Sequence, residues 1–159
     1  MCYNIATQDE CSERSDTMNL VDRANKYPEI GDIYLMNFGG SSSEQRGLRP
    51  GLVFQNNLGN RYSPNIIALP LTSSIKKVNQ PTHVYIPSSV GLMRDSIVLC
   101  ENPERMSKDK LGTYLLTLPE KYMSEIAIAS LLATSVISFI DLNSLISTWQ
   151  KAASLNAVS

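Results

Sequence analysis

The sequence predicts an α+β fold that is mainly β: a small barrel or sandwich of short antiparallel strands with helices toward its C-terminal end. Two observations support this class. From Gly31 onward, short runs rich in β-forming residues recur at regular spacing between turns of Gly, Pro and Asn, and after Leu118 the apolar residues recur at helical spacing instead. The chain has 159 residues, 43% of them hydrophobic, which is enough for one domain with its own core.

Six segments have the composition of strands. The first, Asp32–Phe38, is rich in β-formers and ends at a Gly-Gly pair. Pro70 in the third segment predicts an edge strand or a bulge, because proline cannot donate a hydrogen bond to a neighbouring strand. The stretch between the second and third segments has the composition of a loop. The predicted strands are 32–38, 52–55, 66–72, 82–86, 96–100 and 113–118.

Two helices are expected after the last strand. The sequence Thr117-Leu118-Pro119-Glu120 fits a capping box and predicts a helix running to about Ile140. The apolar run from Ile126 to Ile140 is too short and too rich in Ser and Thr to span a membrane, so we expect a buried helix. A second, amphipathic helix is expected with Asn143 near its start. Its apolar positions at helical spacing are Leu142, Leu145, Ile146, Trp149, Ala152 and Ala153.

The two ends of the chain are expected to lie outside the main domain, which we place at residues 29–140. Residues 1–28 are a polar extension in which we expect poor order, apart from a short helix at 20–26. The N-terminus has neither a basic start nor an apolar stretch, so no signal peptide is expected. Residues 141–159 form a C-terminal amphipathic helical extension.

Several chemistries are disfavoured by what the sequence lacks. It has no HExxH, CxxC or clustered carboxylates, so no metal site is expected, and no GxxxxGK[ST] or GxGxxG, so no nucleotide cofactor is expected. Its one histidine, His83, lies in a predicted strand and is expected to be structural; a two-histidine nuclease would need two chains. Three cysteines, Cys2, Cys11 and Cys100, lack metal-type spacing and indicate reduced thiols of a cytoplasmic protein.

Charge is unevenly distributed along a chain whose net charge is only −1. Residues 1–32 carry seven acidic and three basic side chains, a net of −4, whereas residues 44–83 carry five basic side chains against Glu44, a net of +4. A basic middle can bind phosphates. The alternative interpretation is a solvated surface whose charges face different ways.

One loop concentrates hydrogen-bonding groups. The stretch SEQRGLRPG, residues 43–51, holds a carboxylate, two guanidiniums, an amide and a hydroxyl. A residue before proline is restricted to extended backbone, so Pro50 helps to aim the Arg49 guanidinium. This group is always charged, so it can clamp a phosphate and stabilise developing charge but cannot accept a proton.

Between residues 31 and 140 the chain contains five motifs in order: GDIYLMNF, SEQRGLRPGLVFQNNLGNRYSPN, LPLTSSIKK, PTHVYI and RDSIVLCEN. Their order and spacing resemble the MazF/PemK toxin family, and most closely its MazF branch from Gram-positive bacteria. The resemblance implies an SH3-like, CcdB-fold barrel that forms homodimers. It also implies a metal-independent endoribonuclease of a type II toxin–antitoxin pair, with single-stranded RNA and a cognate antitoxin as partners and neither cofactor nor membrane.

In this family the 2′-hydroxyl of the RNA attacks the adjacent phosphate, leaving a 2′,3′-cyclic phosphate and a 5′-hydroxyl. The resemblance assigns catalysis to Arg49 of the RP motif, Thr72 at the end of the third strand and Glu44 of the SEQ motif. Thr72 could orient the phosphate or the attacking hydroxyl. Glu44 is either a base or a holder of Arg49. The expected RNA-binding residues are Ser43, Gln45, Arg46, Lys76, Lys77, Glu101 and Asn102.

The chain departs from the family pattern at three of these motif positions. Arg46 stands where the family usually has Gly or Ala, and Gly51 replaces the apolar residue that typically follows the proline. Asn102 stands where close relatives carry Gln. The alternative function is therefore a non-cleaving binding protein of the same fold, either a gyrase poison like CcdB or a member that binds RNA or antitoxin only. The retention of Arg49 and Thr72 favours the nuclease. The segment RDSIVL, with Arg94 and Asp95, is expected at the dimer interface.

Overall fold

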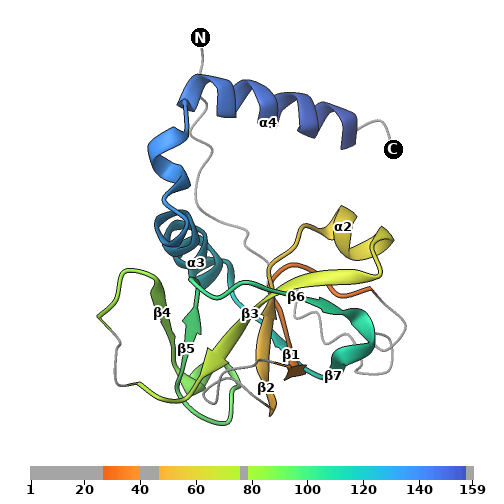
Figure 1. The fold of residues 1–159 in the computed structure, drawn as a ribbon, viewed down its shortest axis with the longest axis vertical. Helices are drawn as coiled ribbons and strands as arrows, with labels where there is room; N and C mark the ends of the chain where they lie inside the picture. The colour runs from red at the N-terminus through yellow and green to blue at the C-terminus, as the bar shows by residue number, and fades with distance from the viewer. Residues whose placement is uncertain (1–26, 40–46, 76–78, 157–159) are drawn as a thin grey trace, which may run out of the picture.

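The computed structural model describes residues 27–39, 47–75 and 79–156, the last five by their backbone alone. Within these ranges, seven antiparallel strands form one sheet, α3 packs against it, and α4 lies beyond α3 (Figure 1). The predicted α+β class is therefore confirmed. The short helix expected at 20–26 falls outside the described residues.

The strands are β1 (Asp32–Phe38), β2 (Gly47–Val53), β3 (Asn65–Thr72), β4 (His83–Ile86), β5 (Ser96–Leu99), β6 (Glu104–Ser107) and β7 (Leu111–Thr117). The helices are α2 (Asn57–Tyr62), α3 (Glu120–Ala133) and α4 (Leu142–Asn156). Three short 3-10 helices are η1 (Ser88–Val90), η2 (Lys108–Lys110) and η3 (Val136–Phe139).

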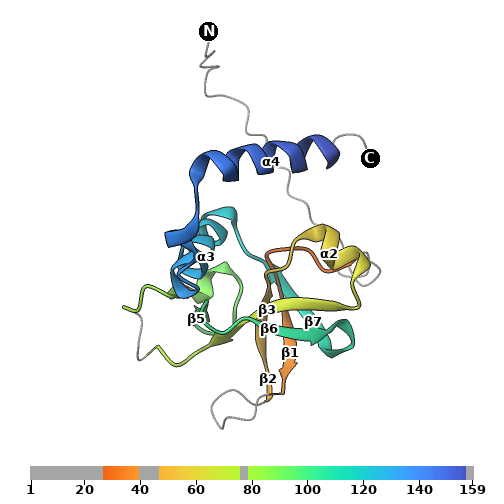
Figure 2. The ribbon, with the colours of Figure 1, turned by 45° about the horizontal axis from the view of Figure 1, so that its top comes forward.

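The strand order is β4-β5-β3-β2-β1-β7, with β6 also paired to β3. Strand β3 is shared by the two halves of the sheet, because β2 pairs along one of its edges while β6 and then β5 pair along the other. No pairing within the described ranges joins β4 to β7, so the sheet is open and not a closed barrel. In Figure 2 the β5 and β7 sides lie at opposite ends of the sheet.

All six predicted strands are present, and β1 matches its prediction at both ends. Strand β2 begins earlier than predicted, at Gly47, because its first half pairs with β1. Strand β6 was not predicted. Its sequence ERMS has one buried residue, Met106, and no apolar run, so only its pairing with β3 identifies it as a strand. Helix α2 was not predicted either, since the stretch 56–65 has the composition of a loop.

Pro70 lies in a central strand, so the predicted edge position is wrong. On one side it pairs with Gly51 of β2. On the other side β6 pairs with residues 65–68 and β5 pairs with Leu71 and Thr72. Pro70 therefore falls where the neighbouring strand changes, and there its missing N–H interrupts no continuous ladder.

The predicted capping box is wrong, as is the predicted end of the first helix. The N-cap of α3 is Pro119, which makes no side-chain cap bond. Thr117 ends β7 instead, where its hydroxyl donates to the buried Asp32 carboxylate at 2.6 Å. The helix ends at Ala133, well before the predicted end, because Ser135 adopts the left-handed region with a φ of 56°.

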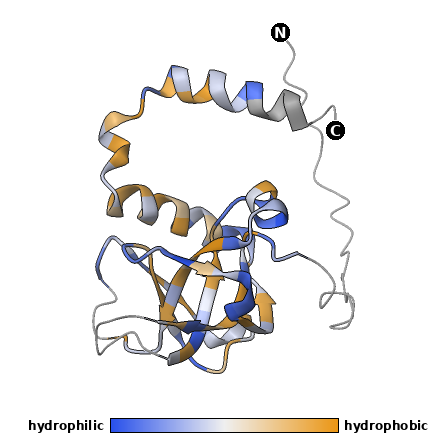
Figure 3. Ribbon diagram, turned by 45° about the vertical axis from the view of Figure 1, so that its right-hand side comes forward, coloured by the Kyte–Doolittle hydropathy of each residue, from blue (hydrophilic) through white to orange (hydrophobic). Residues whose placement is uncertain are grey.

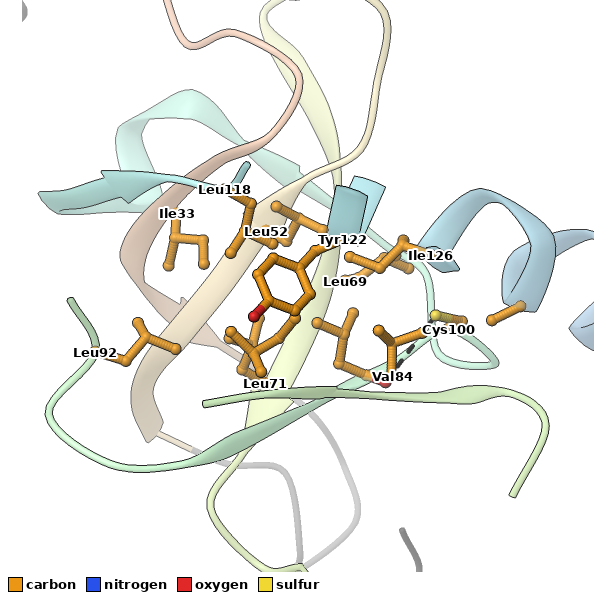
Figure 4. Packing of buried hydrophobic residues seen from close by; sticks show 13 residues of the cluster. Ile33, Leu52, Leu69, Leu71, Val84, Leu92, Cys100, Leu118, Tyr122 and Ile126 are labelled. Carbon is orange, nitrogen blue, oxygen red and sulfur yellow. Dashed lines mark hydrogen bonds between the residues drawn. The ribbon is translucent and has the colours of Figure 1, made fainter. Parts of the chain in front are cut away.

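Helix α3 covers the core with one face only, so the expected buried helix is wrong. Tyr122, Ile126 and Ala129 recur at three to four residues and are buried. They pack against apolar residues of the sheet such as Leu69 and Val84 (Figure 4). The opposite face is left in water: Ile128, for example, is 62% exposed.

The expected second helix is confirmed as α4. Asp141 caps its start by accepting a hydrogen bond from the Ser144 N–H at 2.8 Å. Hydrogen bonding from the Ser144 side chain, and then from its backbone, lowers the pKa of the Asp141 carboxyl. Its described apolar side chains, Leu142, Leu145, Ile146 and Trp149, are exposed, the last of them at 69%. Figure 3 shows α4 as a helix of mixed hydropathy apart from the sheet.

A second cluster of buried residues packs on the side of the sheet away from the α3 core. Its members are Met36, Phe38, Val53, Ile66, Ala68 and Met106. Gly51 faces this cluster at a point where there is no room for a side chain. A Cβ added at Gly51 would lie 2.5 Å from Met36 Sδ and 2.7 Å from Phe38 Cζ. Two large side chains of β1 thus occupy the volume that an apolar residue at position 51 would need.

Gly51→Val is expected to lower the free energy of unfolding by about 1–3 kcal/mol, because overpacking forces Met36 and Phe38 to shift. Urea denaturation of the variant and the wild type measures this. Gly39→Ala is the matched control, since the nearest atom to its added Cβ is the flexible Lys110 Nζ at 3.9 Å. A Gly51→Val variant as stable as the wild type would contradict the packing described here.

A chain that ends at Ile140 is expected to melt within about 2 °C of the full chain, because every described side chain of α4 is exposed and contributes little burial. Circular dichroism melting tests this. A chain ending at Leu118 is the contrasting variant: it lacks Tyr122 and Ile126 and should lose its cooperative transition. A fall of about 5 °C or more on removing α4 alone would show that it supports the domain.

Candidate functional site

The candidate site is built on the pairing of β2 with β3. Leu52 pairs with Leu69 and Gly51 with Pro70, and the Phe54 N–H donates to the Ile67 carbonyl at 2.9 Å in the same register. These pairs share one register, and a slip of one residue would turn the side chains of one strand to the other face of the sheet.

The connection between the two strands is the motif QNNLGNRYSPN, and its polar side chains bond to its own backbone. Asn56 caps α2 by accepting from the Gly59 N–H at 2.8 Å. The buried Asn60 donates to the Gln55 carbonyl at 2.8 Å, and Ser63 accepts from the Asn65 N–H at 3.0 Å. The motif is therefore a structural turn that returns the chain in a fixed register.

Continuing this register two residues beyond Gly51 and Pro70 places Arg49 opposite Thr72. Both residues still belong to their strands, β2 and β3. Directly opposite residues of an antiparallel pair point to the same face with Cβ atoms about 5 Å apart. The observed β2–β3 pairing ends at Gly51 and Pro70, so a site formed by Arg49 and Thr72 stays a prediction that this register supports.

The two side chains offer complementary hydrogen-bonding groups. Arg49 and Thr72 are both half-buried. The Thr72 hydroxyl oxygen accepts a hydrogen bond from the Ser74 N–H at 3.2 Å, which leaves the hydroxyl proton to donate elsewhere. A guanidinium with several donors beside a hydroxyl donor suits an anion with several oxygens, such as a phosphate.

The row continues across the sheet. Thr72 pairs with Ile97 of β5, and Ile97 pairs with Tyr85 of β4. Arg49, Thr72, Ile97 and Tyr85 therefore lie on one face in a line perpendicular to the strands. Ile97 is buried, whereas Tyr85 is 40% exposed.

Glu101 and Asn102 lie away from this row. They follow β5 in a turn, where the Asn102 N–H donates to the Leu99 carbonyl at 3.2 Å. Glu101 Oε1 lies 2.8 Å from Nε2 of His83, whose side chain is only 7% exposed. Glu101 thus partners the histidine, and the structural role of His83 stays a prediction.

The remaining predicted site residues cannot be placed. Ser43, Glu44, Gln45, Arg46, Lys76 and Lys77 fall outside the described residues. Their assignment stays a prediction that rests on the sequence. The chain at Arg49 and the chain at Thr72 do lead directly into these two segments.

Asp95, expected at a dimer interface, organises a turn within its own chain. Its carboxylate accepts from the Tyr85 hydroxyl at 2.7 Å and from the Ser88 N–H at 2.7 Å. The first contact is the main cause of the lowered pKa of Asp95 and of the raised pKa of Tyr85. The interface role of Arg94 and Asp95 stays a prediction.

Cys100 is a packing residue and not a nucleophile. It is 1% exposed, and burial raises the pKa of its thiol to about 11. Within the described ranges no three His, Cys, Asp or Glu side chains gather as a metal site would require. No helix of that part of the chain is long and apolar enough to cross a membrane.

The family model for the PemK-like, MazF-like toxin of type II toxin–antitoxin systems matches residues 29–132. The chain belongs to this family. The match includes the whole sheet and nearly all of α3, and helix α4 lies outside it.

Two relatives within the toxin family are close to this chain in sequence. Endoribonuclease MazF of Staphylococcus saprophyticus is 40% identical over 98 residues, covering 60% of this chain and 82% of that protein. Endoribonuclease EndoA of Bacillus subtilis is 36% identical over 111 residues, covering 69% of this chain and 96% of that protein.

Solved structures of the toxin family share the fold. An endoribonuclease in complex with its cognate antitoxin, from a mycobacterial species, superposes with a TM-score of 0.59 at 29% identity and covers 69% of this chain and 96% of that one. MazF from Deinococcus radiodurans superposes with a TM-score of 0.61 at 23% identity, covering 70% of this chain and 99% of that one. The second likeness concerns the fold alone.

Sequence reasoning missed two features of the site. The QNNLGNRYSPN motif has a structural role, and its cap residue Asn56 three positions before Gly59 was an available signal for α2. Tyr85 shares the face of Thr72. The alternation in THVYI places His83 and Tyr85 on one face, but which strand lies beside them cannot be deduced from that alternation.

Proposed function

We propose that this protein is the toxin of a type II toxin–antitoxin pair and a metal-independent endoribonuclease that cuts single-stranded RNA at short sequence motifs. Membership of the toxin family and the names of its relatives support the toxin and nuclease assignment. The observation that supports the chemistry is the β2–β3 register, which, extended two residues beyond Gly51 and Pro70, sets Arg49 opposite Thr72.

The reaction is an internal transfer at phosphorus. The 2′-oxygen bonds to the adjacent phosphorus while the bond to the 5′-oxygen breaks, which gives a 2′,3′-cyclic phosphate and a 5′-hydroxyl. The proton lost from the 2′-hydroxyl balances the proton gained by the leaving 5′-oxygen, so no water is consumed.

Arg49 clamps the phosphate and stabilises the charge that grows on its oxygens. Thr72 donates its hydroxyl proton to a phosphate oxygen or orients the attacking hydroxyl. Glu44 serves either as the base that removes the 2′-proton or as a holder of Arg49, and the two roles predict different pH dependence. The Arg49 guanidinium and the Thr72 hydroxyl supply the charge stabilisation for which other nucleases use a metal ion.

The proposed partners are single-stranded RNA, a cognate antitoxin and a second copy of the chain, in the cytoplasm. Complexes of relatives with antitoxin support the second of these. Ser43, Gln45, Arg46, Lys76, Lys77, Glu101 and Asn102 are the proposed RNA contacts, of which Glu101 is occupied by His83 in this structure. Residues 29–140 form the catalytic unit, and 1–28 and 141–159 are extensions.

Arg49→Ala is expected to slow cleavage of a long RNA by about 10²–10³-fold, because one preorganised donor is lost from the charged transition state. Cleavage is measured in EDTA, with the ends mapped for cyclic phosphate and 5′-hydroxyl. Arg61→Ala, on the exposed side of α2, is the matched control and should cut normally. Binding without cleavage by the wild type would favour the non-cleaving alternative, and cleavage abolished by EDTA would refute metal independence.

Thr72→Val should slow single-turnover cleavage far more than Thr72→Ser. Valine keeps the branched shape but removes the hydroxyl, whereas serine keeps the hydroxyl at a cost of about 1 kcal/mol of stability or less. Melting temperatures of both variants control for folding. If Thr72→Val cleaves the RNA as fast as Thr72→Ser or faster, the Thr72 hydroxyl has no part in the chemistry.

A further inference from the structure

Tyr85 is an exposed aromatic side chain in line with the Arg49–Thr72 pair, and neither the sequence prediction nor the proposed chemistry uses it. Pairing of Thr72 with Ile97, and of Ile97 with Tyr85, puts its side chain on the same face of the sheet. Two strand spacings of about 4.8 Å separate its backbone from that of Thr72, so it lies roughly 10 Å from Thr72. That distance is too long for a part in the chemistry and short enough to meet a neighbouring nucleotide.

The ring is held in place by its hydroxyl. Tyr85 donates to Asp95 Oδ2 at 2.7 Å, and Asp95 is itself fixed by the Ser88 N–H on its other oxygen. The residue nevertheless remains 40% exposed. An aromatic ring tethered at its tip and open to solvent is a preorganised surface for stacking.

The charge beside the ring selects the part of the nucleotide that can bind. The Asp95 carboxylate at the tip of the ring repels a phosphate, whereas a base is uncharged and stacks on aromatic side chains in single-stranded RNA complexes. The neighbouring polar pair on this face, His83 and Glu101, is engaged internally at 2.8 Å. Tyr85 is therefore the group on this part of the face that best suits a base.

We propose that Tyr85 stacks on a base that flanks the cleaved bond and so helps to select and hold the RNA next to Arg49 and Thr72. This inference rests on the proposed function for the position of the cleaved bond. Stacking on one base tolerates different base identities, so Tyr85 contributes affinity and register more than recognition of one base.

The test measures binding of an RNA whose cleaved bond has been mapped with the wild type, made uncleavable by a 2′-deoxy substitution at the attacking position. Tyr85→Leu should bind it roughly 5- to 100-fold more weakly, the usual range for loss of one base stack. Tyr85→Phe keeps the ring but loses the contact with Asp95 that holds it, so it should bind more weakly than the wild type and more tightly than Tyr85→Leu. Tyr62→Leu, an exposed tyrosine of α2 outside the row, is the matched control.

Abasic substitutions at each position of the same RNA identify the stacked base. At one flanking position, the abasic RNA should bind wild type and Tyr85→Leu equally, because the stack is already absent. Equal binding of all variants to the intact RNA would overturn the proposal. A Tyr85→Phe variant as weak as Tyr85→Leu would also overturn it, since the hydroxyl contact would then matter and the ring would not.

Two further readouts separate base stacking from a role of Tyr85 in subunit contacts and from a failure of the nuclease assignment. Light scattering of the Tyr85 variants should match the wild type, and dissociation into smaller species would place Tyr85 at a subunit contact and refute the stacking role. If the wild type cuts nothing, binding is measured instead on a defined unstructured single-stranded RNA that carries no 2′-deoxy substitution. A dependence on Tyr85 there would sustain the stacking role although the nuclease assignment had failed, and no dependence would refute both.

Discussion

The antiparallel register of β2 and β3 is the constraint on which the site depends. Pairing of Gly51 with Pro70 sets Arg49 opposite Thr72, and a slip of one residue would turn one of the two side chains to the other face of the sheet. Two features hold the register. The QNNLGNRYSPN turn bonds to its own backbone at the end distant from the site, and Gly51 fits closely beneath Met36 and Phe38 near it. Packing on one face and polar turn chemistry thus hold the two strands that carry Arg49 and Thr72.

The same register explains why a glycine at position 51 is compatible with function. An apolar residue there would fill the second core cluster from β2, whereas in this chain β1 fills it with two large side chains. Side chains therefore fill this volume whether position 51 is apolar or glycine, so β2, which carries Arg49, stays packed against the cluster. Beyond β3, the row extends to Ile97 and Tyr85 because β5 and β4 pair in a matching register. The sheet therefore provides one face on which the proposed phosphate-binding pair and an aromatic side chain lie in line.

Much of this could be predicted from the sequence, and the failures have physical reasons. The β-forming composition of DIYLMNF and the Gly-Gly pair after it predicted β1 at both ends, and the RP motif pointed to Arg49 because proline restricts the residue before it. Pro70 was misplaced because tolerance of proline in a central strand depends on which neighbours pair with it, and that is a property of the whole sheet. Thr117 looked like a helix cap but bonds to Asp32, which is 85 residues earlier in the chain. The exposed face of α3 could not be predicted from the sequence, because the helix carries apolar residues on both faces.

The central claim is that Arg49 and Thr72 act on one phosphate as a unit created by the strand register. A double-mutant cycle tests it most directly: single-turnover cleavage of one RNA in EDTA by the wild type, Arg49→Ala, Thr72→Val and the double variant. We predict that the double variant is about as slow as Arg49→Ala alone, because a hydroxyl cannot orient a phosphate that is no longer clamped. If the two losses multiply, the residues act independently, and the unit described here does not exist.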